Sequence, residues 1–154
     1  MKRPYAEIAS ALRRSIPSNA GRKERMSALV GAVWKCLEPL GVSWVGFYLP
    51  APGGEELILG PRRDKPACSP IGLHGVCGRS WRERRPVVVE DIRDLGQNYI
   101  ACDPADRSEL VLPVFGSDGE PWAVLDLDSH EPGFFTQADV AGLRQVLETV
   151  FPAA

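Results

Sequence analysis

The chain has 154 residues, of which 44% are hydrophobic and 25% are charged, and its formal net charge is -2 at pH 7. This size and composition are those of one globular domain, so we expect residues 1–154 to form a single domain. The charge gives no reason to expect nucleic acid or an anionic membrane as a partner, and no apolar run approaches the roughly 18 residues of a membrane span. The charged start of the chain lacks the apolar core of a secretion signal, so the cytoplasm is the expected compartment.

The thiol and imidazole side chains do not form a metal-binding pattern. The four cysteines are Cys36, Cys68, Cys77 and Cys102. They include no CxxC pair, and His74 and His130 do not stand at zinc-ligand spacing from them. We therefore expect no metal and no cofactor, which leaves thiol chemistry or simple burial as the role of these cysteines.

Hydrophobic periodicity and turn residues predict a mixed fold. In chain order, the pattern predicts helices at 5–15 and 22–40, a strand hairpin at 42–49 and 56–60, a long loop at 61–75, a short helix at 75–84, a strand at 86–91, a second loop at 93–108, a strand hairpin at 109–115 and 121–128, and a final helix that begins at Thr136. Hairpins imply antiparallel pairing. We therefore expect an α+β fold, with a mainly antiparallel sheet of about five or six strands and helices packed on one face.

Side-chain alternation in the first strand separates two kinds of residue. Val45 and Phe47 share one face, which is the natural core face, while Trp44, Gly46 and Tyr48 share the other. The glycine between the two aromatic side chains is expected to leave an open slot on that second face.

The last hairpin places acids on a common face. A two-residue type I′ turn at Asp118-Gly119 would put Glu109 directly opposite Asp128, and Val111 opposite Asp126. Three carboxylates would then cluster, although like charges opposed across a strand pair are destabilising.

Two interpretations of these acids remain open. In the first, they lie on a solvated outer face, where charge costs little. In the second, a cation or a shared proton compensates them. A ligand ammonium group would suit both the acids and the aromatic faces of Trp44 and Tyr48, and a clustered carboxyl group would have a raised pKa and could donate a proton near neutral pH.

The segment "ACDPADRSEL" (101–110) places Cys102 among acids. Neighbouring carboxylates raise the pKa of a thiol, which is a poor arrangement for attacking an amide. It suits a target that needs a proton as much as a nucleophile. Reduction of a sulfoxide is such a reaction, because protonation of the oxygen makes the sulfur electrophilic. The oxidised cysteine must then be resolved by a second thiol, for which Cys68 and Cys77 are candidates, although either could be purely structural.

An ordered set of short motifs adds a family resemblance. The motifs are "WVGFYL", "LGP…KPAC", "GVCG", "IACD", "SELVLPV" and "VLDLDS". In this order they resemble the free methionine-(R)-sulfoxide reductases, a branch of the GAF domain family. The resemblance implies a single GAF-type domain over 1–154. It also implies thiol-dependent reduction of free L-methionine-(R)-sulfoxide to L-methionine, through a cysteine sulfenic acid and a disulfide relay, with a thioredoxin-type reductant as partner.

The resemblance also implies roles for individual residues. Cys102 matches the attacking cysteine, Cys68 the resolving cysteine that forms a disulfide with it, and Cys77 a third cysteine that can join the relay. The substrate-binding set that the resemblance implies consists of Trp44, Tyr48, Glu109, Asp126 and Asp128. Its acids would hold the substrate ammonium group and the sulfoxide oxygen, and its aromatic rings would enclose the methyl-sulfur end.

Two other functions remain open from the sequence. One is a GAF sensing module that binds an amino-acid-like small molecule without catalysis. The other is a redox-responsive protein whose thiols react with oxidants and have no substrate. The sequence also leaves the oligomeric state open, a homodimer included.

Overall fold

The computed structural model describes residues 2–98 and 102–152. In chain order its elements are α1 (Tyr5–Ser15), α2 (Arg22–Leu37), the 3-10 helix η1 (Glu38–Leu40), β1 (Val42–Pro50), β2 (Glu56–Arg63), β3 (Ile71–Gly72), α3 (Val76–Glu83), β4 (Val87–Val89), the 3-10 segment η2 (Ile92–Asn98), β5 (Ser108–Phe115), β6 (Pro121–Ser129) and α4 (Gln137–Val150). The predicted elements are present. The predicted loop at 61–75 is shorter than expected, because β2 extends to Arg63 and β3 follows it, and residues 99–101 of the second predicted loop lie outside the described residues.

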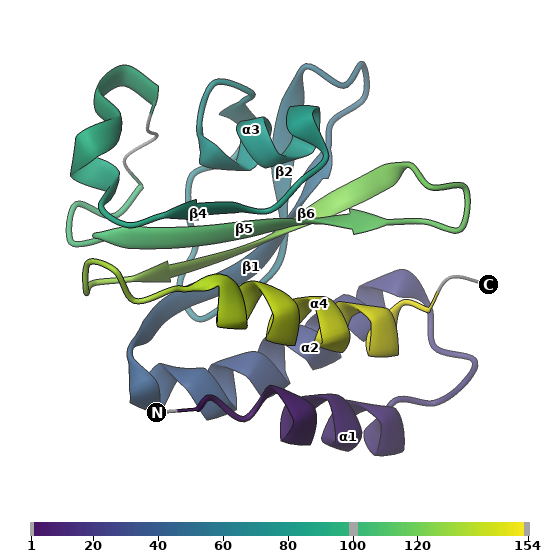
Figure 1. Cartoon of the computed structure of the whole chain (residues 1–154). Coiled ribbons are helices and arrows are strands. Elements are labelled where there is room, and N and C mark those ends of the chain that lie inside the picture. The colour runs from purple at the N-terminus through teal and green to yellow at the C-terminus, as the bar shows by residue number, and fades with distance from the viewer. Residues whose placement is uncertain (1, 99–101, 153–154) are drawn as a thin grey trace.

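The described strands form one six-stranded antiparallel sheet in the order β3-β2-β1-β6-β5-β4. Helices α2 and α4 cover one face of this sheet, and α1 packs against them on the same side (Figure 1). The short helix α3 lies on the opposite face, together with the loops that surround it (Figure 1). The fold is therefore α+β, and the face under α3 is bounded by loops rather than by long helices.

The alternation predicted for β1 divides the buried side chains into two groups. Val45 and Phe47 pack in the main core between the sheet and the three long helices. Trp44 and Tyr48 pack on the other face, in a smaller group that includes Cys77 of α3. Because the main core supplies most of the apolar burial, the smaller group is free to contain polar residues.

The turn between β5 and β6 differs from the predicted type I′ turn. The Gly119 N–H donates to the Gly116 carbonyl (3.0 Å), and the Gly116 N–H donates to the Glu120 carbonyl (2.9 Å). Within the turn only Gly119 has a positive φ, at +79°, so the connection is a three-residue loop whose last residue is left-handed. A register shift between Val114 and Phe115 then offsets the extra loop residue. Two local differences cancel, and the predicted pairing of the two strands is preserved.

Among the described residues, no helix combines the length and the apolar character that crossing a bilayer would need.

Candidate active site

Three adjacent strands place the predicted polar residues on the sheet face under α3. Glu109 of β5 lies opposite Asp128 of β6, as the sequence predicts. From the other side of β6, Trp44 of β1 is also paired with Asp128, and Gly46 with Asp126. Since side chains alternate along each strand, acids and aromatics project from neighbouring positions of the same face.

A small cavity lies between these strands, α3 and the loops. It is lined by Trp44, Tyr48, Ala67, Ile71, Val76, Cys77, Cys102, Asp106, Glu109, Asp126 and Asp128. Seven of the eight predicted site residues therefore line one cavity. The eighth, Cys68, is bonded to one of them, because it forms a disulfide with Cys102.

The acids are buried, which contradicts the interpretation of a solvated outer face. Glu109 is 7% exposed and Asp126 is 5% exposed, while Asp128 is half-buried. Among the described residues, the Oδ1 atom of Asp126 has no hydrogen-bond partner. A buried polar atom without a partner is costly, so this oxygen indicates a place where a bound donor group would fit.

Burial and mutual repulsion hold protons on these acids. Burial is the main cause that raises the pKa of Glu109, Asp126 and Asp128 well above the usual carboxyl range. Repulsion adds to it, since Asp126 raises the pKa of Glu109, Asp128 raises that of Asp126, and Glu109 raises that of Asp128. These acids therefore keep their protons to a higher pH than exposed carboxyl groups do, and they can act as proton donors.

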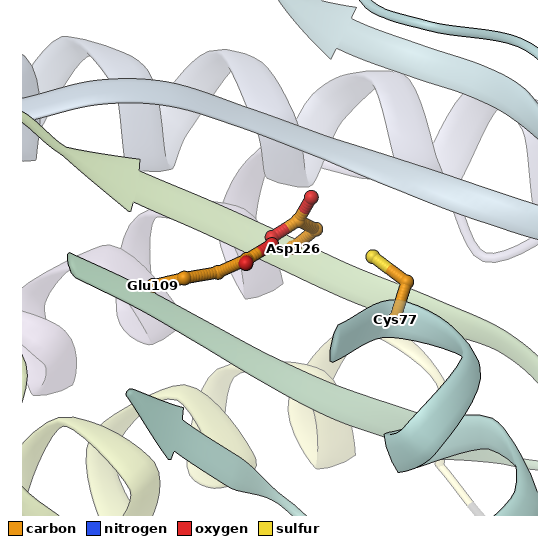
Figure 2. A group of neighbouring side chains, drawn as sticks. All are labelled: Cys77, Glu109 and Asp126. Carbon is orange, nitrogen blue, oxygen red and sulfur yellow. The ribbon is translucent and has the colours of Figure 1, made fainter. Parts of the chain in front are cut away.

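Cys77 faces the acids from the first turn of α3. Its sulfur and one carboxylate oxygen each of Glu109 and Asp126 lie within 4.8 Å of one another (Figure 2). Burial, followed by repulsion from Asp126, raises the pKa of the Cys77 thiol well above its usual value. Cys77 is a free cysteine, and at neutral pH it is a protonated thiol beside the acids.

The aromatic wall differs from the predicted open slot. The Trp44 and Tyr48 rings are tilted against each other with centroids 6.2 Å apart. A Cβ added to Gly46 would lie 2.9 Å from Trp44 Cζ2, so the indole ring itself occupies the space over the glycine. Gly46 is thus needed to admit the Trp44 ring, and the ligand space lies beside the two aromatics.

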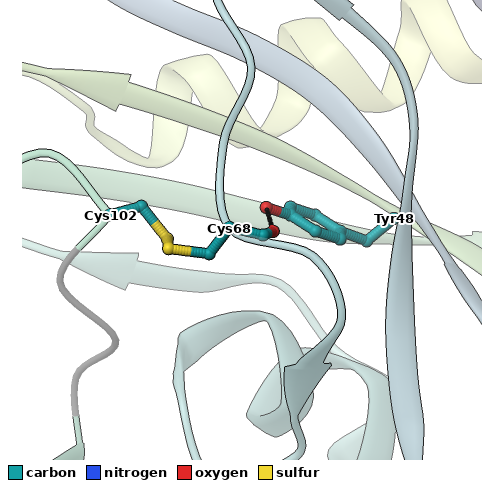
Figure 3. Close-up of a disulfide and its surroundings, with 3 residues drawn as sticks. All are labelled: Tyr48, Cys68 and Cys102. Atoms are coloured by element: carbon teal, nitrogen blue, oxygen red, sulfur yellow. Dashed lines mark hydrogen bonds between the residues drawn. A yellow bond between two sulfur atoms is a disulfide. The ribbon is translucent and has the colours of Figure 1, made fainter.

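The loop that carries Cys68 is held at the rim of this cavity. The disulfide partners Cys68 and Cys102 have Cα atoms 5.5 Å apart, the usual spacing for such a bond. The Tyr48 hydroxyl donates a hydrogen bond to the Cys68 carbonyl at 2.8 Å (Figure 3). Trp44 Nε1 likewise donates to the Lys65 carbonyl at 2.9 Å. Both aromatic side chains of the pocket therefore also fasten this loop.

Sequence reasoning did not single out Asp106, which lines the cavity and is 8% exposed. Burial, with a contribution from Asp103, raises the pKa of Asp106 to about 6, and the Ser43 hydroxyl donates to its carboxylate at 3.3 Å. Asp106 stands in "ACDPADRSEL", but strand alternation does not apply in a loop. No sequence pattern there indicated that its side chain turns toward the acids.

Two groups of described side chains have atoms close enough together to ligate a metal ion: Cys77, Glu109 and Asp126, and Asp103, Asp106 and His130. In the first group a metal would have to displace protons, because the pKa of each member is raised. In the second, Asp103 already accepts a hydrogen bond from Lys65. In both groups, atoms that a metal would need are thus already engaged, by protons in the first and by the Lys65 donor in the second.

Comparison with known proteins identifies the family. The GAF domain model matches residues 21–151. The chain resembles the reduced form of the Staphylococcus aureus free methionine-R-sulfoxide reductase with a TM-score of 0.88 and 31% identity, over 99% of this chain and 96% of that chain. This chain belongs to the free methionine-R-sulfoxide reductase family of GAF-domain proteins.

Two further family members support the assignment. The Escherichia coli free methionine-R-sulfoxide reductase is 40% identical over 108 residues, which cover 69% of this chain and 62% of the relative. The Neisseria meningitidis enzyme, solved in complex with its substrate, matches with a TM-score of 0.85 and 31% identity over 95% of this chain and 85% of that chain. The expected family and GAF fold are thus confirmed, while the roles of individual site residues remain predictions.

Proposed function

We propose that this chain reduces free L-methionine-(R)-sulfoxide to L-methionine by thiol chemistry at Cys102. The observation that carries the proposal is the buried Asp126 oxygen, which has no partner among the described residues, in a cavity that Cys102 also lines. The family members above carry the same activity in their names. The acids account for recognition of a free amino acid, and the thiol accounts for the electrons.

The acidic side of the cavity binds the substrate ammonium group. Glu109, Asp126 and Asp128 offer carboxylate oxygens, and a bound ammonium donates to the unpaired oxygen of Asp126. A residue within a peptide has no free ammonium group, so the pocket selects the free amino acid. The Trp44 and Tyr48 rings enclose the methyl-sulfur end, where their apolar faces exclude water.

The first chemical step transfers oxygen from the substrate to Cys102. One of the acids, whose pKa is raised by burial, donates a proton to the sulfoxide oxygen, and the Cys102 sulfur attacks the substrate sulfur. An S–S bond forms between Cys102 and the substrate, the S–O bond breaks, and the oxygen leaves as water with the donated proton and the thiol proton of Cys102. That water then attacks the Cys102 sulfur, the S–S bond breaks, methionine leaves, and Cys102 becomes a sulfenic acid as one proton returns to the acid. The substrate gains two electrons, and Cys102 loses two.

The second step closes the disulfide between Cys68 and Cys102. The Cys68 sulfur attacks the sulfur of the Cys102 sulfenic acid, the S–S bond forms, and the hydroxyl leaves as water with the proton of the Cys68 thiol. A dithiol of the thioredoxin type then reduces this bond and is itself oxidised to a disulfide. Cys77 supplies a third thiol close to the acids and can join the relay.

The test is methionine release from the separate R and S epimers of free methionine sulfoxide, with dithiothreitol as reductant. We expect methionine from the R epimer alone, and loss of turnover in Cys102→Ser. Cys36→Ser is the matched control, because Cys36 lies in α2 on the opposite face of the sheet (Figure 1). Absence of methionine from both epimers, with the thiols shown to be reduced, would contradict the proposal. A sulfoxide-dependent rise in melting temperature in that case would favour a sensing module.

A further inference from the structure

A second contact joins the two loops that share the disulfide. Lys65 Nζ donates to Asp103 Oδ2 at 2.6 Å. Lys65 lies three residues before Cys68, and Asp103 directly follows Cys102. We name this ion pair the Lys65–Asp103 clasp. It spans the same two loops as the disulfide, and neither of its charged groups takes part in the thiol chemistry.

Both ends of the clasp are fixed to the rest of the molecule. Asp103 Oδ1 accepts the Ala105 N–H at 2.9 Å, and His130 Nε2 lies 3.3 Å from Asp103 Oδ2. On the other loop, the Lys65 carbonyl accepts the Trp44 indole N–H. The clasp therefore connects one loop, anchored by a pocket aromatic, to another, anchored by its own turn.

We propose that Lys65 and Asp103 are positioning residues that keep Cys68 close to Cys102 while the disulfide is open. This inference rests on the proposed function, in which the bond opens and closes once per turnover. Closure requires the Cys68 thiol to meet the Cys102 sulfenic acid before another thiol does. A contact that restricts two loops to neighbouring positions raises the effective concentration of one thiol at the other.

The charges of the clasp persist over the working pH range. The hydrogen bond from Lys65 is the largest cause that lowers the pKa of Asp103, to about 2, and the same bond raises the pKa of Lys65. The Lys65 side chain is 52% exposed, and exposed ion pairs contribute little to global stability. The effect of the clasp is therefore expected on the local arrangement of the two loops.

The experiment measures the equilibrium between the reduced protein and oxidised glutathione, which yields the Cys68–Cys102 disulfide and two molecules of reduced glutathione. The oxidised fraction of this one pair is read by peptide mass spectrometry across glutathione buffers. We expect Lys65→Met to lower the effective concentration of the pair about two- to fivefold, as an exposed ion pair allows. Lys65→Arg restores most of the loss. Lys35→Met, on α2 across the sheet, is the matched control and leaves the equilibrium unchanged.

Asp103→Asn tests the partner, because its amide oxygen can still accept the Ala105 N–H. The double variant Lys65→Met/Asp103→Asn should lose no more than either single variant, since each removes the same contact. Equal equilibria in wild type and Lys65→Met, failure of Lys65→Arg to restore the loss, or additive losses in the double variant would each overturn the proposal. The measurement needs no methionine sulfoxide, so failure of the clasp is distinguishable from failure of the proposed reductase activity.

Discussion

At the scale of single residues, the buried carboxyl group of Asp126 is the feature that most directly links stability to ligand binding. It is buried beside two other acids, and its Oδ1 atom has no partner among the described residues. Such a group costs stability in the ligand-free protein, because its charged form is both desolvated and repelled. In the proposed function, an ammonium group that enters the pocket offsets this cost. The carboxyl group of Asp126 is therefore expected to favour ligand binding and to lower the stability of the ligand-free protein.

The variant Asp126→Asn distinguishes the effect of this carboxyl group on substrate binding from its effect on stability. We expect kcat/KM for free methionine-(R)-sulfoxide to fall roughly 10- to 100-fold, the value of a lost charge-assisted hydrogen bond, with most of the change in KM. The melting temperature of the ligand-free protein should stay equal or rise, since the variant removes a buried group whose raised pKa costs stability. Steady-state kinetics and thermal unfolding on the same preparation check both expectations. A fall in melting temperature without any change in kcat/KM would show that Asp126 is structural.

At the scale of elements, the β5–β6 hairpin sets the alignment of the acids. Its register depends on a left-handed Gly119 at the turn and on the shift between Val114 and Phe115. Removing only one of these features would move Glu109 away from its position opposite Asp128 by one residue, which also reverses the face. Both the turn and the register shift are therefore needed to keep Glu109 opposite Asp128.

Gly119→Ala tests the turn without crowding it, because an added Cβ meets no atom within 4 Å. The strain is purely conformational, and we expect a loss of about 1–2 kcal/mol in the free energy of unfolding. Gly119→Asn is the matched control and should lose less, since asparagine tolerates the left-handed region better. Urea unfolding measures both variants. Equal losses in the two would argue against a conformational origin.

In the same elements, some structural features could be predicted from the sequence and others could not. Alternation in β1, β5 and β6 identified the acids and aromatics of the pocket. Thr136, where the last helix was expected to begin, is the N-cap of α4 and forms a capping box with Asp139. The turn type was wrong, because Asp118-Gly119 is compatible with both a two-residue and a three-residue loop. Contacts between irregular segments, such as that of Lys65 with Asp103, have no periodicity and could not be predicted.

At the scale of the whole molecule, the fold separates stability from chemistry. The apolar core between the sheet and α1, α2 and α4 lies on one face. Helix α3 lies on the other face (Figure 1), and the acids line a cavity together with Cys77 of α3. The main core can thus support a group of buried acids that would otherwise be too costly. The prediction that residues 1–154 form one domain remains a prediction, and the GAF match spans 21–151.

The buried acids make the free energy of unfolding depend on pH. The pKa values of Glu109, Asp126 and Asp128 are higher in the folded state than the usual value near 4. The folded state therefore binds more protons than the unfolded state, and the free energy of unfolding should fall as pH rises above about 4.5. Below about pH 4, loss of the ion pair of Asp103, whose pKa is lowered to about 2, works in the other direction.

Urea unfolding of the ligand-free protein at a series of pH values from 5 to 8 checks this expectation. Wild type should lose stability across the series, and Asp126→Asn should lose less, because it has one fewer acid to ionise. Stability that rises with pH over this range, or identical slopes in the two proteins, would show that the acids do not have raised pKa values in the folded state.

The indole of Trp44 contacts both the pocket and the loop that carries Cys68. Its ring lies over Gly46 and beside Tyr48, and its N–H is bonded to the loop that carries Cys68. Indole emission responds both to hydrogen bonding and to the polarity around the ring. We therefore expect Trp44, one of four tryptophans in the chain, to contribute a change in emission when the pocket is occupied or when the loop that carries Cys68 rearranges, without any added label.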